Sequence, residues 1–112
     1  MGRIKYIPER GDIIKLNLSP TRGHEQSGYR PALVLSWKKF NARGGQLIIC
    51  PITSKVRKDP FETMIKTSKI KGVVLVDQIR TVDLYARKIK YAGECPHEAL
   101  HDVTAKLLVL IS

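Results

Sequence analysis

The sequence predicts a mainly β protein, in which short strands form a small, strongly bent barrel and one α-helix follows at the C-terminal end. Short apolar runs separated by turn residues occupy most of the chain, which is typical of strands. A helical spacing of apolar residues occurs only after Pro96. A chain of 112 residues suits one domain with its own core. We therefore expect a single α+β domain over residues 1–112, with the helix packed on the barrel.

Three strands are expected in the first half of the chain, after a flexible lead-in over residues 1–10. Residues 12–18 alternate between apolar and polar, which predicts a half-buried strand. Residues 32–35 are continuously apolar, as in a strand covered on both faces. A Gly-Gly turn precedes the third apolar strand, residues 46–52.

The connections between these strands carry aromatic and basic residues. Residues 37–41 are expected to form one helical turn or an irregular link. Trp37 and Phe40 are expected to form a lid on the core, with stacking on bases as the alternative. The segment 55–71 is rich in lysine and arginine and contains a short apolar stretch at 61–65. We interpret it as a mobile loop followed by an edge strand.

The second half of the chain contains the strongest strand signal and the helix. Residues 72–78 include four consecutive apolar residues, 80–83 suit a short strand or bend, and 84–91 fit helix or strand, with strand favoured. Pro96 stands at the first position of the predicted helix. The apolar stripe of that helix consists of Leu100, Val103, Leu107, Leu108 and Ile111.

The charge balance points to a polyanionic partner. The chain contains 20 Lys and Arg against 10 Asp and Glu, which gives a formal net charge of +10. Such a surplus attracts phosphates and releases their counterions, so nucleic acid is the leading partner class. A role in solubility alone is the simpler alternative. A membrane surface is disfavoured, because no basic amphipathic helix is present in the sequence.

Targeting and cysteine patterns suit a cytoplasmic protein without a cofactor. The N-terminal residues lack an apolar signal region, and no run approaches the roughly 18 apolar residues of a membrane span. Cys50 lies in an apolar strand and Cys95 precedes the helix, without CxxC or histidine spacing. We expect two buried thiols, no metal and no cofactor.

The most chemically loaded stretch joins the first two strands, at residues 22–31. It reads Arg-Gly-His-Glu-Gln-Ser-Gly-Tyr-Arg-Pro and is longer than an ordinary hairpin turn. Its two glycines allow left-handed backbone angles and close approach of a ligand. Pro31 fixes where the second strand begins. The stretch therefore predicts a functional loop, with an ordinary polar surface loop as the alternative.

The residues 23–31, Gly-His-Glu-Gln-Ser-Gly-Tyr-Arg-Pro, resemble a loop of the MazF/PemK family of toxin endoribonucleases. The likeness continues in order through five blocks, at residues 10–13, 19–21, 30–36, 50–54 and 72–81. The resemblance implies an SH3-like barrel that pairs into a homodimer. It also implies metal-independent, sequence-specific cleavage of single-stranded mRNA, and neutralisation by a cognate, acidic, MazE-like antitoxin.

The same resemblance implies catalytic roles for residues from separate segments. Arg30 begins one strand, Thr53 ends another and Asp77 ends a third, so the three can meet at one rim of a barrel. The guanidinium of Arg30 suits stabilisation of a crowded phosphate, and Thr53 suits orientation of the phosphate or the ribose 2′-hydroxyl. The base is left open between His24, Glu25 and Asp77.

The family pattern is not matched at every position. One branch of the family, the Kid-like toxins, places an arginine two residues before the aspartate, where this chain has Leu75. Arg30 must then carry more of the charge stabilisation. The polar and basic residues expected to bind RNA are Gln26, Ser27, Tyr29, Ser54, Lys55, Arg57, Lys58, Gln78, Arg80 and Arg87.

Two other readings stay open from the sequence. The first is a non-catalytic inhibitor like the CcdB-like gyrase poisons, which end in Trp-Gly-Ile, whereas this chain ends Val-Leu-Ile-Ser over residues 109–112. The second is an RNA-binding barrel that does not cleave.

Overall fold

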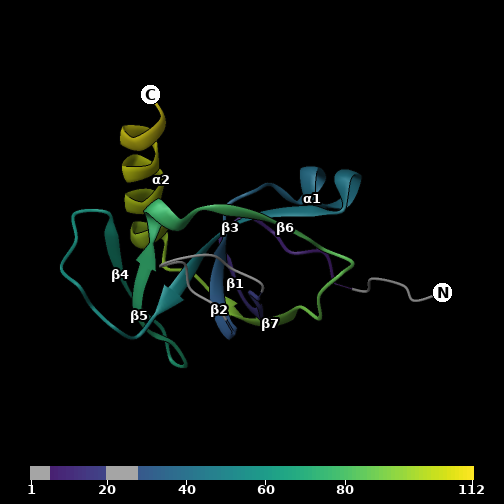
Figure 1. Ribbon diagram of the computed structural model, residues 1–112, viewed down its shortest axis with the longest axis horizontal. Coiled ribbons are helices and arrows are strands. Elements are labelled where there is room, and N and C mark those ends of the chain that lie inside the picture. The colour runs from purple at the N-terminus through teal and green to yellow at the C-terminus, as the bar shows by residue number, and fades with distance from the viewer. Residues whose placement is uncertain (1–5, 20–27) are drawn as a thin grey trace.

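The computed structural model describes residues 6–19 and 28–112, and their strands form one curled antiparallel sheet. Helix α2 stands against one side of this sheet, while α1 lies beside the start of β3 (Figure 1). In chain order the elements are β1 (Asp12–Asn17), β2 (Tyr29–Val34), α1 (Lys38–Gly44), β3 (Gln46–Thr53), β4 (Glu62–Lys66), β5 (Lys71–Leu75), the 3₁₀ helix η1 (Val76–Gln78), β6 (Arg80–Asp83), β7 (Lys90–Glu94) and α2 (His97–Ile111).

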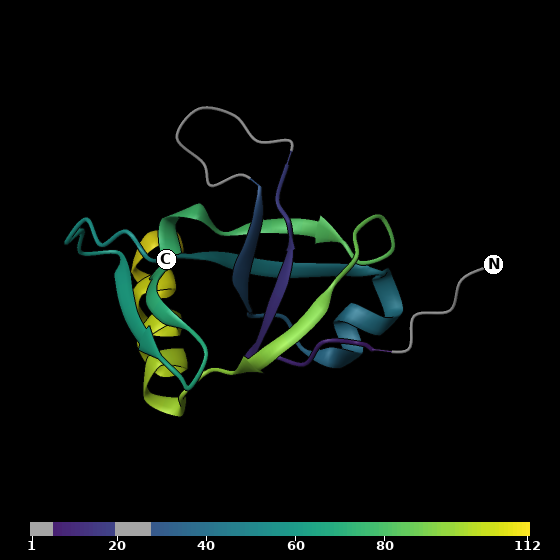
Figure 2. The ribbon, with the colours of Figure 1, turned by 90° about the horizontal axis from the view of Figure 1, so that it is seen from below.

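The sheet bends around β3, because the two halves of this strand have different neighbours on one edge. The first half of β3 pairs with β6, whereas its last two residues, Ile52 and Thr53, pair with β5. The other edge of β3 pairs with β2. Beyond these strands, β1 and β7 extend one side of the sheet and β4 ends the other. The result is a barrel-like curl in which β1 and β2 run across β3 (Figure 2).

Two apolar cores lie on the two sides of this sheet. The first core lies between the sheet and α2, where Val103 is fully buried and Leu100 and Leu107 pack against it. The second core is built from residues of β1, β2, β3 and β6. Successive residues of β1 divide between the cores, Ile13 in the first and Ile14 in the second, as the alternation of a strand requires.

Polar contacts fix α2 to the edge strand β4. The Lys106 ammonium lies 2.8 Å from Oδ2 of Asp102 and also donates to the carbonyl oxygen of Glu62 at 2.6 Å. The Thr63 hydroxyl donates to the same carboxylate oxygen at 2.7 Å. Together the hydrogen bonds from Lys106 and Thr63 hold the pKa of Asp102 below its usual value.

Most of the predicted elements are confirmed. The mainly β class, the bent sheet and the C-terminal helix are all present. The strands expected at residues 12–18, 32–35, 46–52 and 61–65 correspond to β1, β2, β3 and β4 with shifted ends. β4 is an edge strand, as predicted. Both cysteines are free and buried, also as predicted.

Two strand predictions are wrong. The strand expected over 72–78 ends at Leu75, because the chain turns through η1 to bring β6 to a different part of β3. The strand favoured over 84–91 is absent until Lys90. The reason is a turn in which a carboxylate oxygen of Asp83 accepts the N–H of Tyr85 at 2.8 Å.

Two further expectations are wrong, one for Trp37 and one for the described part of the lead-in. Trp37 is 65% exposed and lies against the Arg10 guanidinium rather than over the core, with the Arg10 Cζ atom 5.2 Å from the ring centroid. The described part of the lead-in is anchored, because the Tyr6 hydroxyl donates to Asp12 at 2.6 Å. Burial and this hydrogen bond raise the pKa of Tyr6.

The apolar stripe of α2 is only partly buried. Leu108 and Ile111 of the predicted stripe are exposed, together with Val109 and Leu110. The buried part of the helix is therefore its first three turns, and its last turn is an uncovered apolar surface.

We expect Gly72→Ala to destabilise the fold by about 1–3 kcal/mol, as overpacked sites do. A Cβ atom at Gly72 would lie 2.3 Å from the carbonyl oxygen of Thr53, where β5 approaches the end of β3. Urea unfolding of the variant and the parent measures the difference. Gly44→Ala is the matched control, because a Cβ atom there meets nothing within 4 Å. Equal stability of the Gly72→Ala variant and the parent would contradict this packing.

Candidate functional site

Arg30 and Thr53 lie at the same end of two neighbouring strands. In the β2–β3 ladder Ala32 is opposite Pro51. This is the last pair of the ladder, and Arg30 and Thr53 each lie two residues beyond it, at the same end of the two strands. The two residues then share one face of the sheet, because alternate residues of a strand do. A half-buried guanidinium and a hydroxyl thus belong to one rim of the curled sheet.

Thr53 is held closely by its surroundings. Its side chain is 4% exposed, and its hydroxyl oxygen accepts the backbone N–H of Lys55 at 3.2 Å. The Gly72 backbone packs directly against the Thr53 carbonyl group. A buried threonine with this packing has little freedom to move, so its hydroxyl has a defined position at the strand end.

Asp77 lies on η1, directly after β5, and its side chain is exposed. Burial of the Cys50 thiol, together with the Asp77 carboxylate, raises the pKa of Cys50 to about 12. Asp77 is thus an exposed carboxylate that acts electrostatically on β3, the strand that ends at Thr53.

The segment that joins β1 to β2 is closed at its base by hydrogen bonds. The Leu18 N–H donates to the Gly28 carbonyl at 2.8 Å, and the Gly28 N–H donates to the Ser19 hydroxyl at 3.1 Å. These bonds bring the two ends of the segment together beside Arg30. Four predicted site residues lie within the segment, outside the described residues: His24, Glu25, Gln26 and Ser27.

Two predicted RNA-binding arginines hold the end of β1. The guanidinium of Arg80 donates from Nη1 to the Leu18 carbonyl at 3.0 Å. Arg87 donates from Nη1 to the carbonyl of Asn17 and, at 2.9 Å, to that of Ser19. Both side chains thus fix the base of the segment described above. Gln78, at the end of η1, is half-buried.

The basic loop after β3 is organised by one carboxylate. The Glu62 side chain accepts the backbone N–H groups of Arg57 and Lys58, each at 3.1 Å from Oε1. The loop side chains predicted to bind RNA are exposed: Ser54, Lys55, Arg57 and Lys58. Backbone N–H groups therefore fill the acceptor positions of the Glu62 carboxylate, and the cationic side chains of the loop remain at the surface.

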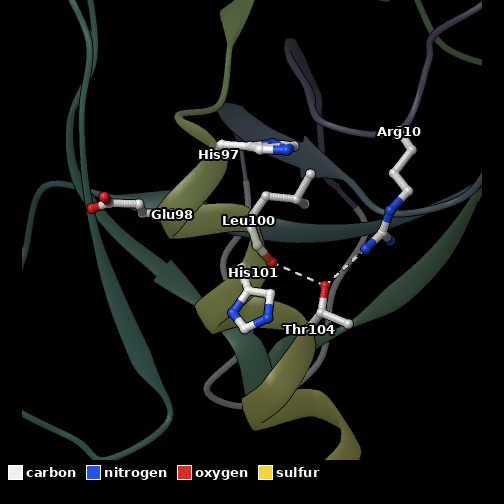
Figure 3. Close-up of a pocket in the computed structure, with 6 residues that line it drawn as sticks. All are labelled: Arg10, His97, Glu98, Leu100, His101 and Thr104. Carbon is white, nitrogen blue, oxygen red and sulfur yellow. Dashed lines mark hydrogen bonds between the residues drawn. The ribbon is translucent and has the colours of Figure 1, made fainter.

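A cavity of about 450 Å³ lies elsewhere, at the start of α2 (Figure 3). Arg10 reaches across it from the chain before β1 and donates to the Thr104 hydroxyl at 2.9 Å. His97 and His101 stand one helical turn apart on the same wall, and Glu98 points away from the other side chains. The cavity contains none of the predicted catalytic residues.

Sequence reasoning missed a group of lysines around Tyr29. Lys15, Lys69 and Lys90 line one pocket with this ring. Tyr29 was predicted to bind RNA, but the lysines come from three separate segments. Only the fold brings these three lysines together, and no short sequence motif predicts the group.

Within the described ranges 6–19 and 28–112, no three His, Cys, Asp or Glu side chains gather as candidate metal ligands. No helix in the described part of the chain is both long enough and apolar enough to cross a membrane.

Fold and charge together define a class of protein: a small, strongly basic, curled β-sheet domain with an arginine and a threonine at one strand-end rim. Residues 9–111 match the family described as "PemK-like, MazF-like toxin of type II toxin-antitoxin system". The chain therefore belongs to this toxin family.

Individual relatives agree with the family match. The chain is 36% identical over 107 residues to "Endoribonuclease toxin MazF" of Escherichia coli strain K12, covering 96% of each chain. It resembles a crystal structure of MazF from Deinococcus radiodurans with a TM-score of 0.90 and 39% identity, covering 95% of this chain and 97% of that one. A MazE-MazF structure from the same organism has a TM-score of 0.84 and 34% identity, with 96% and 97% covered. By this membership the chain is an enzyme of the endoribonuclease class.

Proposed function

We propose that this toxin cleaves single-stranded mRNA at specific sequences, without a metal ion, by attack of the substrate's own 2′-hydroxyl. The single observation that supports the proposal most strongly is the β2–β3 ladder, because Arg30 and Thr53 each lie two residues beyond its last pair, at the same end. The net charge of +10 supports a polyanionic substrate. Single strands suit sequence-specific binding, because a duplex hides most of its base edges.

In this mechanism the 2′-oxygen attacks the adjacent phosphorus, and the bond from phosphorus to the 5′-oxygen breaks. The products are a 2′,3′-cyclic phosphate and a 5′-hydroxyl, so no water is consumed in this step. Arg30 stabilises the negative charge on the crowded phosphate through forked N–H donors. It is a poor proton donor, because a guanidinium group holds its proton very tightly, so the electrostatic role is the one proposed.

Thr53 orients the phosphate or the 2′-hydroxyl rather than accepting its proton, because an unassisted hydroxyl is a very weak base. The proton acceptor is proposed to be His24 or Glu25. Both belong to the segment whose ends meet beside Arg30. Asp77 is the third candidate, because its exposed carboxylate lies on η1, directly after β5.

Two partners follow from the family. A cognate antitoxin with an acidic segment would neutralise the basic rim, and the similarity to a MazE-MazF structure supports a partner of this kind. A homodimer is proposed because the last turn of α2 exposes four apolar side chains in a row, and such patches mark protein interfaces. The cytoplasm, where mRNA is translated, is the proposed location.

The purified protein should cleave a long RNA transcript in the presence of EDTA and leave 5′-hydroxyl ends. The reason is that the nucleophile and the charge stabilisation come from the ribose and from side chains. Polynucleotide kinase labels 5′-hydroxyl products directly, without prior phosphatase treatment, and mapping the labelled ends gives the recognition sequence. Products with 5′-phosphates would contradict the mechanism. Intact RNA that is still bound would indicate a binding barrel, and gyrase inhibition without cleavage would indicate a CcdB-like inhibitor.

Arg30→Ala should reduce kcat by about 10²–10³-fold, the usual effect of removing a donor that stabilises transition-state charge. Affinity for RNA should fall much less, because other basic residues contact the strand. Single-turnover cleavage and fluorescence anisotropy measure the two effects separately. Arg43→Ala is the matched control, since this arginine lies in the last turn of α1. Equal cleavage rates for Arg30→Ala and the parent would refute the role of Arg30.

Thr53→Val should reduce cleavage by about 10²-fold, the scale expected when a reacting group loses its positioning contact. Valine keeps the side-chain shape and removes only the hydroxyl. Thr63→Val is the matched control, because Thr63 is also 4% exposed but its hydroxyl donates to Asp102 of α2. Cleavage assays and thermal melts of both variants decide the outcome. A similar loss of activity in both would show that Thr53 acts through stability alone.

A further inference from the structure

We propose that a lysine-lined pocket on the opposite face of β2 from Arg30 binds nucleotides that flank the cleaved bond. In this subsite a base stacks on Tyr29, and phosphates lie on Lys15, Lys69 and Lys90. The inference rests on the proposed function, because it extends the binding site for the same single-stranded RNA.

The pocket has a volume of about 290 Å³ and forms where the β4–β5 turn approaches three other strands. Lys15 belongs to β1, Tyr29 to the start of β2 and Lys90 to the start of β7, while Lys69 and Ile70 come from the turn. Four separate segments therefore contribute to one concave surface. None of the lining residues is acidic, so the positive charge of the pocket is not neutralised from within it.

The placement of the lysines is unfavourable for the folded protein by itself. Lys15 is directly opposite Lys90 in the β1–β7 ladder, and like charges opposite each other destabilise a sheet. Lys69 adds a third positive charge to the same pocket. Packing does not explain this arrangement, whereas a bound polyanion removes the repulsion by neutralising all three ammonium groups.

Tyr29 gives the pocket its specificity for nucleotides. Its ring is 61% exposed, although it lies on a strand whose last three residues are buried. The same ring lines a second pocket of about 410 Å³, to which Arg87 and Lys88 contribute positive charge. One exposed aromatic ring thus separates two basic pockets. Single-stranded nucleic acids bind in this way, with a base on an aromatic ring and phosphates on cations to either side.

The pocket is close to the candidate active site but faces away from it. Tyr29 and Arg30 are consecutive residues of β2, so their side chains point to opposite faces while their backbones are about 3.3 Å apart. β2 begins at Tyr29. The pocket therefore lies on the other face of the same strand end as Arg30, and a single-stranded RNA with its cleaved phosphate at Arg30 needs several flanking nucleotides to reach it.

An acidic peptide is the competing occupant. Its carboxylates would neutralise the lysines, but a peptide of acidic residues makes no use of an exposed ring between two basic pockets. The alternation of cation, ring and cation fits a sugar-phosphate strand with a stacked base better. We therefore assign the pocket to RNA, and the acidic peptide becomes an outcome of the test.

The test compares the parent with Lys15→Gln/Lys90→Gln, and uses two RNA oligonucleotides centred on the mapped cleavage site. One has five nucleotides and the other thirteen, and the binding versions carry 2′-deoxyribose at the cleaved position so that they stay intact. Fluorescence anisotropy at several salt concentrations measures affinity. Lys38→Gln/Lys39→Gln, on the exposed surface of α1, is the control with the same change of charge.

The lysine-pair variant should bind the thirteen-nucleotide RNA about tenfold more weakly than the parent. Its slope of log affinity against log salt should fall by roughly 1.4, since each phosphate contact to a single strand contributes about 0.7. Cleavage of the five-nucleotide RNA should be unchanged. Tyr29→Leu should also weaken binding of the longer RNA about tenfold, whereas Tyr29→Phe, which keeps the ring, should not.

Equal affinity of the lysine-pair variant and the parent for the longer RNA would overturn the proposal. An affinity loss no larger than that of the α1 control would overturn it too, because it would reflect net charge alone. If the variant keeps its RNA affinity but loses affinity for a 20-residue poly-glutamate peptide, the pocket is a protein site. Failure of the parent to cleave the long transcript from which the site is mapped is a separate result, which contradicts the proposed function and not the subsite alone.

Discussion

The architecture depends on how β3 shares one of its edges between β6 and β5. One strand paired along this whole edge of β3 would leave the sheet open, whereas two different strands that share the edge make the sheet curl. The exchange occurs just before Thr53, where Gly72 lets the β5 backbone approach the Thr53 carbonyl more closely than any side chain would allow. The residue expected to orient the substrate is therefore fixed by the contact that bends the sheet, so fold and site cannot be altered independently there.

The positive charge of the chain serves more than one purpose. Arg10 donates to the carbonyl of Leu35 and to Thr104, while Arg80 and Arg87 donate to carbonyls at the end of β1. Guanidinium groups suit this use, because they carry several donors in one rigid plane. Lysines, in contrast, supply the flexible charge of the pocket beside Tyr29. Net charge alone therefore overstates the number of cations that are available to a substrate.

The fold class was predictable because its signals are local, whereas the site was predictable only in part. Apolar runs and turn residues located β1 and β3 to within a residue. They could not show that the chain leaves β5 at Leu75, since that turn is set by the distant pairing of β6 with β3. The family resemblance pointed to Arg30, in the loop block, and to Thr53, in the block at residues 50–54. The grouping of Lys15 with Lys69 and Lys90 depends on register across separate strands, which no short motif encodes.

The start of β2 combines these constraints in two consecutive residues. Alternation along the strand directs the Arg30 and Tyr29 side chains to opposite faces. The hydrogen bonds between Leu18, Ser19 and Gly28 hold β1 and β2 together just beyond Tyr29. The first two residues of β2 therefore present an exposed ring on one face of the strand and a guanidinium on the other. An RNA that contacts both faces of β2 must bend between them. A bend next to the cleaved bond would help to align the 2′-hydroxyl with its phosphate.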